Sequence, residues 1–225
     1  MKIKHYSLFE HIKSNNIEWN NLRDDKSEDS YFIPFNKESY IESIKNFDFN
    51  YYVQDIINYC QKNGLTRVIS IGSGKCGLEF HLKCKSNLSI IVTDTSDSII
   101  RIKQYNIFDD AFKFDIINSD ININLNESTL VLLSRIDTEF DDVNFKLLFE
   151  VLKSKNSKHI CLIPANQLTL RIIYAEFKVL IISILKRRKR VFCGYSRTTS
   201  EFIKAWSKHF EIASFKENIF YLTEK

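Results

Sequence analysis

Short apolar runs alternate with stretches of helical periodicity from residue 64 onward. The runs expected to form strands are Arg67–Ile71, Leu88–Thr93, Phe114–Asn118, Thr129–Leu133 and His159–Ile163. The helices expected between them are Gly77–Lys85, Asp97–Tyr105 and Val143–Lys153, the last with an apolar face of Val143, Leu147, Leu148 and Val151. Continuous apolar runs separated by helices are typical of strands buried on both faces, so the pattern predicts a parallel sheet with helical crossovers.

The C-terminal end of the chain has a different pattern. A helix expected over Thr199–His209 precedes two strands, Phe210–Phe215 and Ile219–Thr223, which only Lys216-Glu217-Asn218 separate. Three residues cannot join parallel strands, so these two must form an antiparallel hairpin. The predicted fold class is therefore α/β, with a doubly wound, mostly parallel seven-stranded sheet of Rossmann-like type and an antiparallel C-terminal hairpin.

Residues 1–63 lack this alternation. One helix is expected from near Asn36, and another runs over about Tyr51–Lys62 and ends at Asn63-Gly64. We therefore divide the chain into an N-terminal helical cap segment, 1–63, and a Rossmann-like domain, 64–225, with an inserted helical segment at about 166–197. The aromatic residues of the cap segment, such as Trp19 and Tyr31, are equally consistent with core packing.

Composition places the chain among ordinary globular proteins. Of 225 residues, 44% are hydrophobic and 27% charged, and 18 Phe with 10 Tyr exclude disorder as the dominant state. The five cysteines show no CxxC spacing, and the first residues lack the apolar core of a secretory signal. We expect free thiols in a reducing, cytoplasmic compartment. The longest uncharged apolar run, Val179–Leu185, is far shorter than the roughly 20 residues of a membrane span.

The net charge of +4 is concentrated in one place. Lys186–Arg190 supplies +5, so the other residues sum to 4 − 5 = −1, which disfavours a general nucleic-acid binder. This basic run follows the strongly apolar stretch Leu168–Leu185. Three interpretations stay open: a helix packed on the core, an interfacial helix at 168–190 that contacts a membrane or a lipid-linked acceptor, and a contact to RNA phosphates.

Three of the five glycines lie in Gly72-Ser73-Gly74-Lys75-Cys76-Gly77, between a predicted strand and a predicted helix. Glycines there let the backbone turn sharply and approach a ligand, although a tight turn without a ligand gives the same pattern. Asp94 ends the next strand, where a carboxylate can accept the hydroxyls of an adenosine ribose or cap a helix. Asp120 follows the third predicted strand, near an adenine edge in this architecture or simply in a turn.

These segments resemble the class I S-adenosylmethionine-dependent methyltransferases over residues 64–225. Val68–Gly74 resembles the family's first motif, Val92–Ser96 its ribose motif, Asn118–Asp120 its third motif and Leu130–Ile136 its fourth strand and following loop. The final hairpin is also the family's sheet ending. The resemblance implies S-adenosylmethionine as cofactor, held by Gly72, Ser73, Gly74, Asp94, Thr95, Ser96, Asp120, Ile121 and Ser134. Two positions depart from the family's pattern: Ser70 replaces the usual acid, and Cys76 replaces a common third glycine.

The acceptor site is expected outside the carboxyl ends of the strands, at 134–139 and 164–167. Asp137 is the candidate base that removes the proton of an alcohol, and Arg135 is the candidate group that orients the acceptor. Alternatively, Asp137 and its acidic neighbours form only a loop and a helix N-terminus. No resident metal is expected, and a divalent ion on these acids is the less favoured reading.

The resemblance and the residues together predict methylation of a hydroxyl on a small molecule or glycan, including a lipid-linked saccharide. The cap segment would then cover the cofactor or acceptor side. The alternatives are an RNA methyltransferase, a nicotinamide-dependent oxidoreductase and a non-catalytic adenosine-binding protein. The oligomeric state is left open by the sequence.

Overall fold

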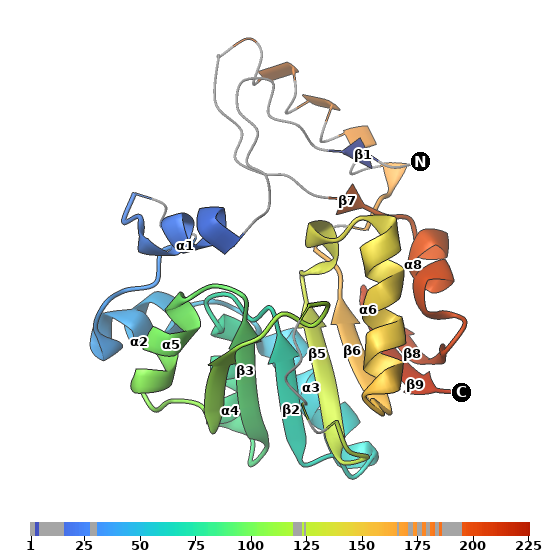
Figure 1. Cartoon of the computed structure of the whole chain (residues 1–225), viewed down its shortest axis with the longest axis horizontal. Helices are drawn as coiled ribbons and strands as arrows, with labels where there is room; N and C mark the ends of the chain where they lie inside the picture. Colours follow the sequence, from blue (N-terminus) through green and yellow to red (C-terminus); the bar gives the residue numbers. More distant parts are fainter. Residues whose placement is uncertain are drawn as a thin grey trace.

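The structure is a computed structural model that describes residues 3–4, 16–27, 31–118, 123, 125–165, 167–170, 173–174, 177–178, 181–182, 185 and 195–225. A seven-stranded sheet in the order β4-β3-β2-β5-β6-β9-β8 forms its centre (Figure 1). The strands are β2 (Arg67–Ile71), β3 (Ser89–Asp94), β4 (Asp110–Lys113), β5 (Thr129–Ser134), β6 (His159–Ile163), β8 (Phe210–Lys216) and β9 (Ile219–Glu224). The neighbouring strands β4, β3, β2, β5 and β6 are parallel, and β9 runs antiparallel to both β6 and β8. The predicted fold class is confirmed.

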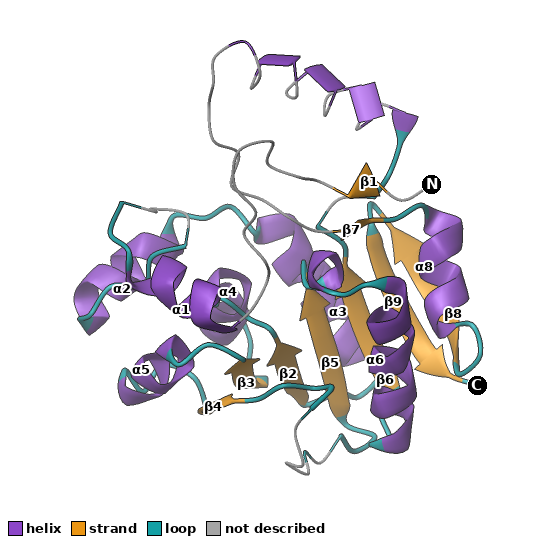
Figure 2. Ribbon diagram, turned by 45° about the horizontal axis from the view of Figure 1, so that its top comes forward, coloured by secondary structure: helices purple, strands orange, loops and turns teal. Residues whose placement is uncertain are grey.

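Helices cover both faces of the sheet (Figure 2). One face carries α2 (Lys37–Lys45), α3 (Asn50–Lys62), α4 (Gly77–Lys85) and α5 (Ser98–Gln104), and the other carries α6 (Asp142–Ser154) and α8 (Thr199–Trp206). The remaining elements are α1 (Asn16–Asp24), the 3-10 turn η1 (Asp137–Glu139) and a two-stranded antiparallel pair, β1 (Ile3–Lys4) with β7 (Tyr195–Ser196). None of the described helices has the length and apolar character that a membrane crossing requires.

The pleat of the strands separates the core into two halves. Val68 and Leu130 point into the half beneath α2 to α5, whereas Ile69 and Val131 point toward α6 and α8. All four side chains are at most 1% exposed. Because both halves are apolar, the strands read as continuous apolar runs in the sequence.

The final hairpin turns more tightly than the three polar residues suggested. Only Glu217 and Asn218 separate β8 from β9, and both adopt positive φ values, of 44° and 69°. Two successive left-handed residues are typical of a type I′ turn, whose twist matches that of the flanking strands.

The prediction of a strand at Phe114–Asn118 is wrong, because the third strand along the chain of the central sheet is β4, at Asp110–Lys113, and it ends just before Phe114. The Asp115 carboxylate accepts hydrogen bonds from the backbone N–H groups of Ile117 and Asn118, at 2.9 and 3.2 Å. This local turn ends the extended conformation, although Phe114 and Ile116 are still buried.

The apolar face predicted for α6 is also wrong in part. Leu148 is fully buried, but Val143 and Leu147 are 75% and 36% exposed. The helix instead buries Phe145, Phe149 and Leu152 together with Leu148. Apolar residues occupy both sides of this helix, and the side that carries the two large aromatic rings faces the sheet.

Candidate cofactor and active site

In the glycine-rich loop between β2 and α4, three residues adopt the left-handed backbone conformation. Gly72, Gly74 and Cys76 have φ values of 68°, 57° and 57°. A Cβ atom on Gly72 would lie 2.6 Å from Cγ2 of Ile136, and one on Gly74 would lie 2.9 Å from the guanidinium of Arg23. Both glycines are therefore favoured by conformation, and a side chain at Gly72 would also clash with Ile136, whereas one at Gly74 would displace the end of the Arg23 side chain. Cys76 adopts the glycine-like conformation at the position where the family commonly has glycine.

Asp94 binds the loop directly from the end of β3. Its Oδ2 accepts a hydrogen bond from the Gly74 backbone N–H at 2.9 Å, and its Oδ1 accepts one from the Ser96 N–H at 2.8 Å. The side chain is 7% exposed. Beside it, Ser73 donates from both its backbone N–H and its hydroxyl to the Thr93 carbonyl, at 2.9 and 2.8 Å. The loop and the end of β3 thus form one hydrogen-bonded unit.

The other residues predicted for the cofactor are distributed around this unit. Ser96 is fully buried and its hydroxyl lies 2.6 Å from that of Ser98, whereas Thr95 and Ser134 are partly exposed. Asp120 and Ile121 lie outside the described residues. The structure therefore brings Gly72, Ser73, Gly74, Asp94, Thr95 and Ser96 together at the carboxyl ends of β2 and β3, with Ser134 at the end of β5.

A buried carboxyl group that the sequence analysis missed lies beneath the loop. Glu79, on the first turn of α4, is 2% exposed, and its Oε1 accepts a hydrogen bond from the Ser70 hydroxyl at 2.5 Å. Burial raises the pKa of Glu79 to about 7; the Asp94 carboxylate adds to the rise and the Ser70 hydrogen bond opposes it. The carboxyl group of Glu79 on α4 therefore lies beside Ser70, the position at which the family usually has an acidic residue. The signal in the sequence is a glutamate three residues before Leu82 on the buried side of this helix.

Asp137 and Arg135 lie on the loop after β5, as predicted. Oδ1 of Asp137 accepts a hydrogen bond from the Ala165 N–H at 2.8 Å, which joins this loop to the one after β6. The side chain is fully buried and its Oδ2 has no partner within the described part of the chain. Burial raises the pKa of Asp137 to about 6, while the hydrogen bond from the Ala165 N–H and, to a smaller extent, the charges of Arg197 and Arg135 oppose the rise. Arg135 is exposed and has a left-handed φ of 60°.

Arg197 is a second residue that the sequence analysis missed. It is 2% exposed and donates to the backbone carbonyls of Asp137 and Phe140, both at 2.5 Å. Its guanidinium lies over the Phe145 ring, 4.4 Å from the centroid. Arg197 therefore fixes the loop that carries Asp137. No pattern in the sequence distinguishes it from the arginines of the basic run that precedes it.

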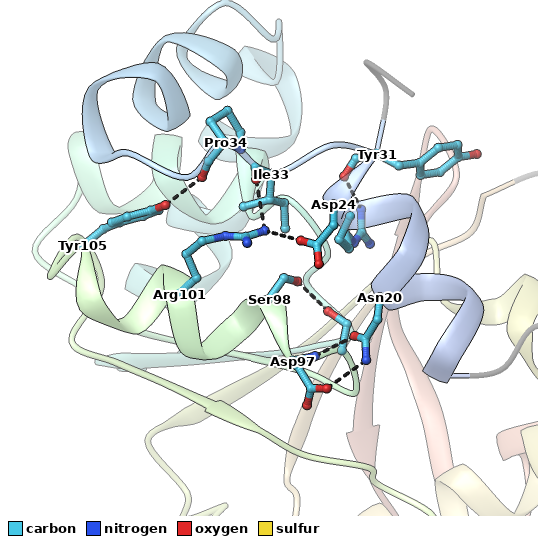
Figure 3. Close-up of polar contacts among 11 residues, drawn as sticks. Asn20, Asp24, Tyr31, Ile33, Pro34, Asp97, Ser98, Arg101 and Tyr105 are labelled. Carbon is cyan, nitrogen blue, oxygen red and sulfur yellow. Dashed lines mark hydrogen bonds and ion pairs between the residues drawn. The ribbon is translucent and has the colours of Figure 1, made fainter. Parts of the chain in front are cut away.

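Helix α1 lies across the carboxyl ends of the strands. Trp19 donates from Nε1 to Glu139 at 3.3 Å, and Asn20 exchanges two hydrogen bonds of 2.8 Å with Asp97 (Figure 3). Arg23 reaches the glycine loop at Gly74. The helix thus contacts the segments that follow β2, β3 and β5.

Two further expectations concern thiols and metals. Cys60, Cys76, Cys84 and Cys161 are free cysteines, whereas Cys193 lies outside the described residues. Within the described ranges, no group of three or more His, Cys, Asp and Glu side chains has the arrangement of a metal site.

The fold is similar to that of known methyltransferases. Human N-acetylserotonin methyltransferase, solved with S-adenosylmethionine, superposes with a TM-score of 0.60 at 13% identity, over 96% of this chain and 61% of that one. Magnesium protoporphyrin IX methyltransferase from Synechocystis PCC 6803, with bound S-adenosylhomocysteine, gives 0.56 at 11% identity, over 95% and 96%. Mitomycin 7-O-methyltransferase gives 0.53 at 10% identity, over 77% and 54%.

No family model matches the chain, and neither does any curated protein. The chain spans about 61% of the human enzyme's length and 54% of the mitomycin enzyme's length. At these identities the likeness concerns the fold, and the chain has the fold of the class I S-adenosylmethionine-dependent methyltransferases.

Proposed function

We propose that this chain is an S-adenosylmethionine-dependent methyltransferase that acts on a hydroxyl group of a small molecule or glycan. The observation that carries the proposal is the bond between Asp94 and the Gly74 N–H, which joins the glycine loop to the end of β3. Each carboxylate oxygen of Asp94 accepts one backbone hydrogen bond, and a carboxylate oxygen can accept two. A ribose can therefore bind Asp94 without displacing the loop.

The loop suits a ligand with a bulky, polar end. Its two left-handed glycines carry no side chain of their own, and a buried cation, Arg23, lies over Gly74. S-adenosylmethionine, when bound, supplies an electrophilic methyl group. The structural neighbours support this choice, since the human and cyanobacterial enzymes were solved with S-adenosylmethionine or S-adenosylhomocysteine.

For the chemical step we propose Asp137 as the base and Arg135 as the residue that orients the acceptor. A pKa of about 6 keeps Asp137 largely ionised at neutral pH, close to the value that suits a base. Its Oδ2 has no hydrogen-bond partner among the described residues, so it retains the capacity to accept a proton. Because Asp137 is fully buried and bonded to the Ala165 N–H, the acceptor hydroxyl must reach it past the loops after β5 and β6.

Titration calorimetry with S-adenosylhomocysteine and NADH tests the cofactor assignment. We expect the full chain to bind S-adenosylhomocysteine and not NADH. Replacing Asp94 with Ala should weaken that binding about 10- to 100-fold, the scale of a lost charged hydrogen bond. Binding of NADH that depends on Asp94 would instead support an oxidoreductase.

We further propose peripheral membrane contact through residues 168–190. Leu170, Tyr174, Phe177, Ile181 and Leu185 follow the spacing of one helical stripe and are 86%, 71%, 61%, 42% and 77% exposed. These described residues lie apart from the sheet (Figures 1 and 2). In the sequence, five cations follow directly at Lys186–Arg190, which lie outside the described residues. An exposed apolar stripe next to cations fits an anionic membrane surface.

Co-sedimentation with phosphatidylserine-containing vesicles at low and high salt tests the membrane proposal. We expect salt-sensitive binding that is lost in Phe177→Asp and in the triple change of Arg187, Arg188 and Arg190 to Ser. The matched control is Val143→Asp, which alters an exposed apolar residue on α6 and should leave binding unchanged. Absence of vesicle binding at low salt, or self-association that Phe177→Asp abolishes without vesicles, contradicts the proposal.

A further inference from the structure

Arg23 is a buried cation that has no counter-ion among the described residues. It lies in the last turn of α1 and is 8% exposed. Its Nη1 donates to the Tyr31 carbonyl at 3.3 Å, and its guanidinium lies 5.1 Å from the centroid of the Trp19 ring. Its Nε is buried with no hydrogen-bond partner, and no carboxylate of the described chain pairs with it.

This arrangement is unfavourable unless an anion joins it. A buried charge is stable only when it is paired and hydrogen-bonded, and one carbonyl at 3.3 Å and one aromatic face satisfy a small part of the guanidinium. Arg101 shares the unpartnered Nε but differs in its counter-ion, since it binds the Asp24 carboxylate at 2.9 Å and the Ile33 carbonyl at 3.0 Å (Figure 3).

The position of Arg23 is fixed by the contacts of its helix. Asn20, one turn earlier, makes the two hydrogen bonds to Asp97, and Asp24 forms the ion pair with Arg101 (Figure 3). Further along the chain, the Tyr105 hydroxyl donates to the Pro34 carbonyl at 2.6 Å. These contacts hold α1 and the segment after it against α5. Arg23 therefore stays over Gly74, where its Nη2 lies 2.9 Å from the place of a Cβ atom.

We propose that Arg23 binds the carboxylate of the amino-acid part of S-adenosylmethionine, above Gly74. This inference rests on the proposed function. The planar guanidinium matches a carboxylate through two parallel hydrogen bonds. The ribose end of the same ligand is assigned to Asp94, which binds the other side of the same loop residue. A dianionic phosphate fits less well, because the Asp94 carboxylate lies within hydrogen-bond distance of the Gly74 N–H.

Two ligands that differ only in this carboxylate test the assignment. They are S-adenosylhomocysteine and S-adenosyl-3-thiopropylamine, its decarboxylated form, titrated into the full chain by calorimetry. For Arg23→Gln we expect about a 10- to 100-fold loss of affinity for S-adenosylhomocysteine and less than about a 2-fold change for the decarboxylated ligand. Arg23→Lys should recover part of the loss, because it keeps the charge but not the planar fork.

Two control variants separate charge from placement. Arg101→Gln loosens α1 without touching the loop, so it should weaken both ligands by the same factor. Arg67→Gln, at the opposite end of β2, should change neither. A loss in Arg23→Gln that is equal for the two ligands, or no loss, overturns the assignment while leaving the proposed function standing. A wild-type protein that binds neither ligand contradicts the proposed function and the assignment with it.

Discussion

Replacing Glu79 with Gln should remove a pH dependence of stability that is built into the site. Glu79 is buried beneath the glycine loop, and its pKa is raised from 4.5 to about 7, chiefly by burial. Between these two pH values the unfolded chain releases the proton and the folded protein keeps it. The folded state then binds more protons, so the free energy of unfolding must fall as the pH rises through this window.

The size of the effect follows from the width of the window. Each pH unit changes the free energy of unfolding by about 1.4 kcal/mol while the two states differ by one proton. From pH 4.5 to about 7 the wild type should therefore lose about 3 kcal/mol through Glu79. Gln keeps the oxygen that accepts the Ser70 hydrogen bond and carries no charge. It should match the wild type near pH 4 and exceed its stability by about 3 kcal/mol at pH 8.

Urea unfolding followed by circular dichroism at pH 4, 5, 6, 7 and 8 measures this difference. Glu150→Gln, which changes an exposed glutamate on α6, is the matched control and should follow the wild-type profile. A constant difference between Glu79→Gln and wild type across the range would refute the reasoning. So would a variant that loses stability relative to wild type as the pH rises.

Other substitutions test the remaining contacts. Gly74→Ala and Gly64→Ala both place a side chain at positive φ, so each should lower the free energy of unfolding by about 1–2 kcal/mol in a thermal melt. Only Gly74→Ala should also lower the affinity for S-adenosylhomocysteine, because its Cβ would displace Arg23, whereas nothing lies within 4 Å of a Cβ on Gly64. Equal affinities of the two variants for S-adenosylhomocysteine would exclude a role in ligand binding for the contact between Arg23 and Gly74. Asp137→Asn should abolish a fall in stability between pH 3.8 and about 6, seen in the same urea series; an unchanged profile argues against the raised pKa. Arg197→Leu should lower the free energy of unfolding in urea by about 2–4 kcal/mol, since one buried and one partly buried carbonyl lose their donor; a loss under about 0.5 kcal/mol contradicts its role in holding the loop.

The sheet was predictable because its strands carry the signal themselves. Arg67–Ile71 and His159–Ile163 are apolar runs bounded by polar residues, and the structure has strands with those bounds. The prediction failed where a local interaction decides. The Asp115 side chain forms a turn within an apolar run whose pattern predicts a strand, and the hydrophobic pattern gives no signal of that turn. On α6, apolar residues on two sides leave the choice of face to packing against the sheet.

The candidate site was predictable only along the loops that follow the strands. Gly72, Gly74 and Asp94 are local signals, and the structure brings them together. Arg23 and Arg197 come from distant segments, so only the tertiary structure reveals their contacts with the loops. Glu79 carried a weak signal, as an acid on the buried side of a helix.

A crystal structure of the full chain with S-adenosylhomocysteine tests the central proposal most directly. We expect the ribose hydroxyls within hydrogen-bond distance of Asp94, and the amino-acid end over Gly74 with its carboxylate on Arg23. A ligand bound away from this loop, or bound with its adenosine end over Gly74, would contradict the proposed cofactor site.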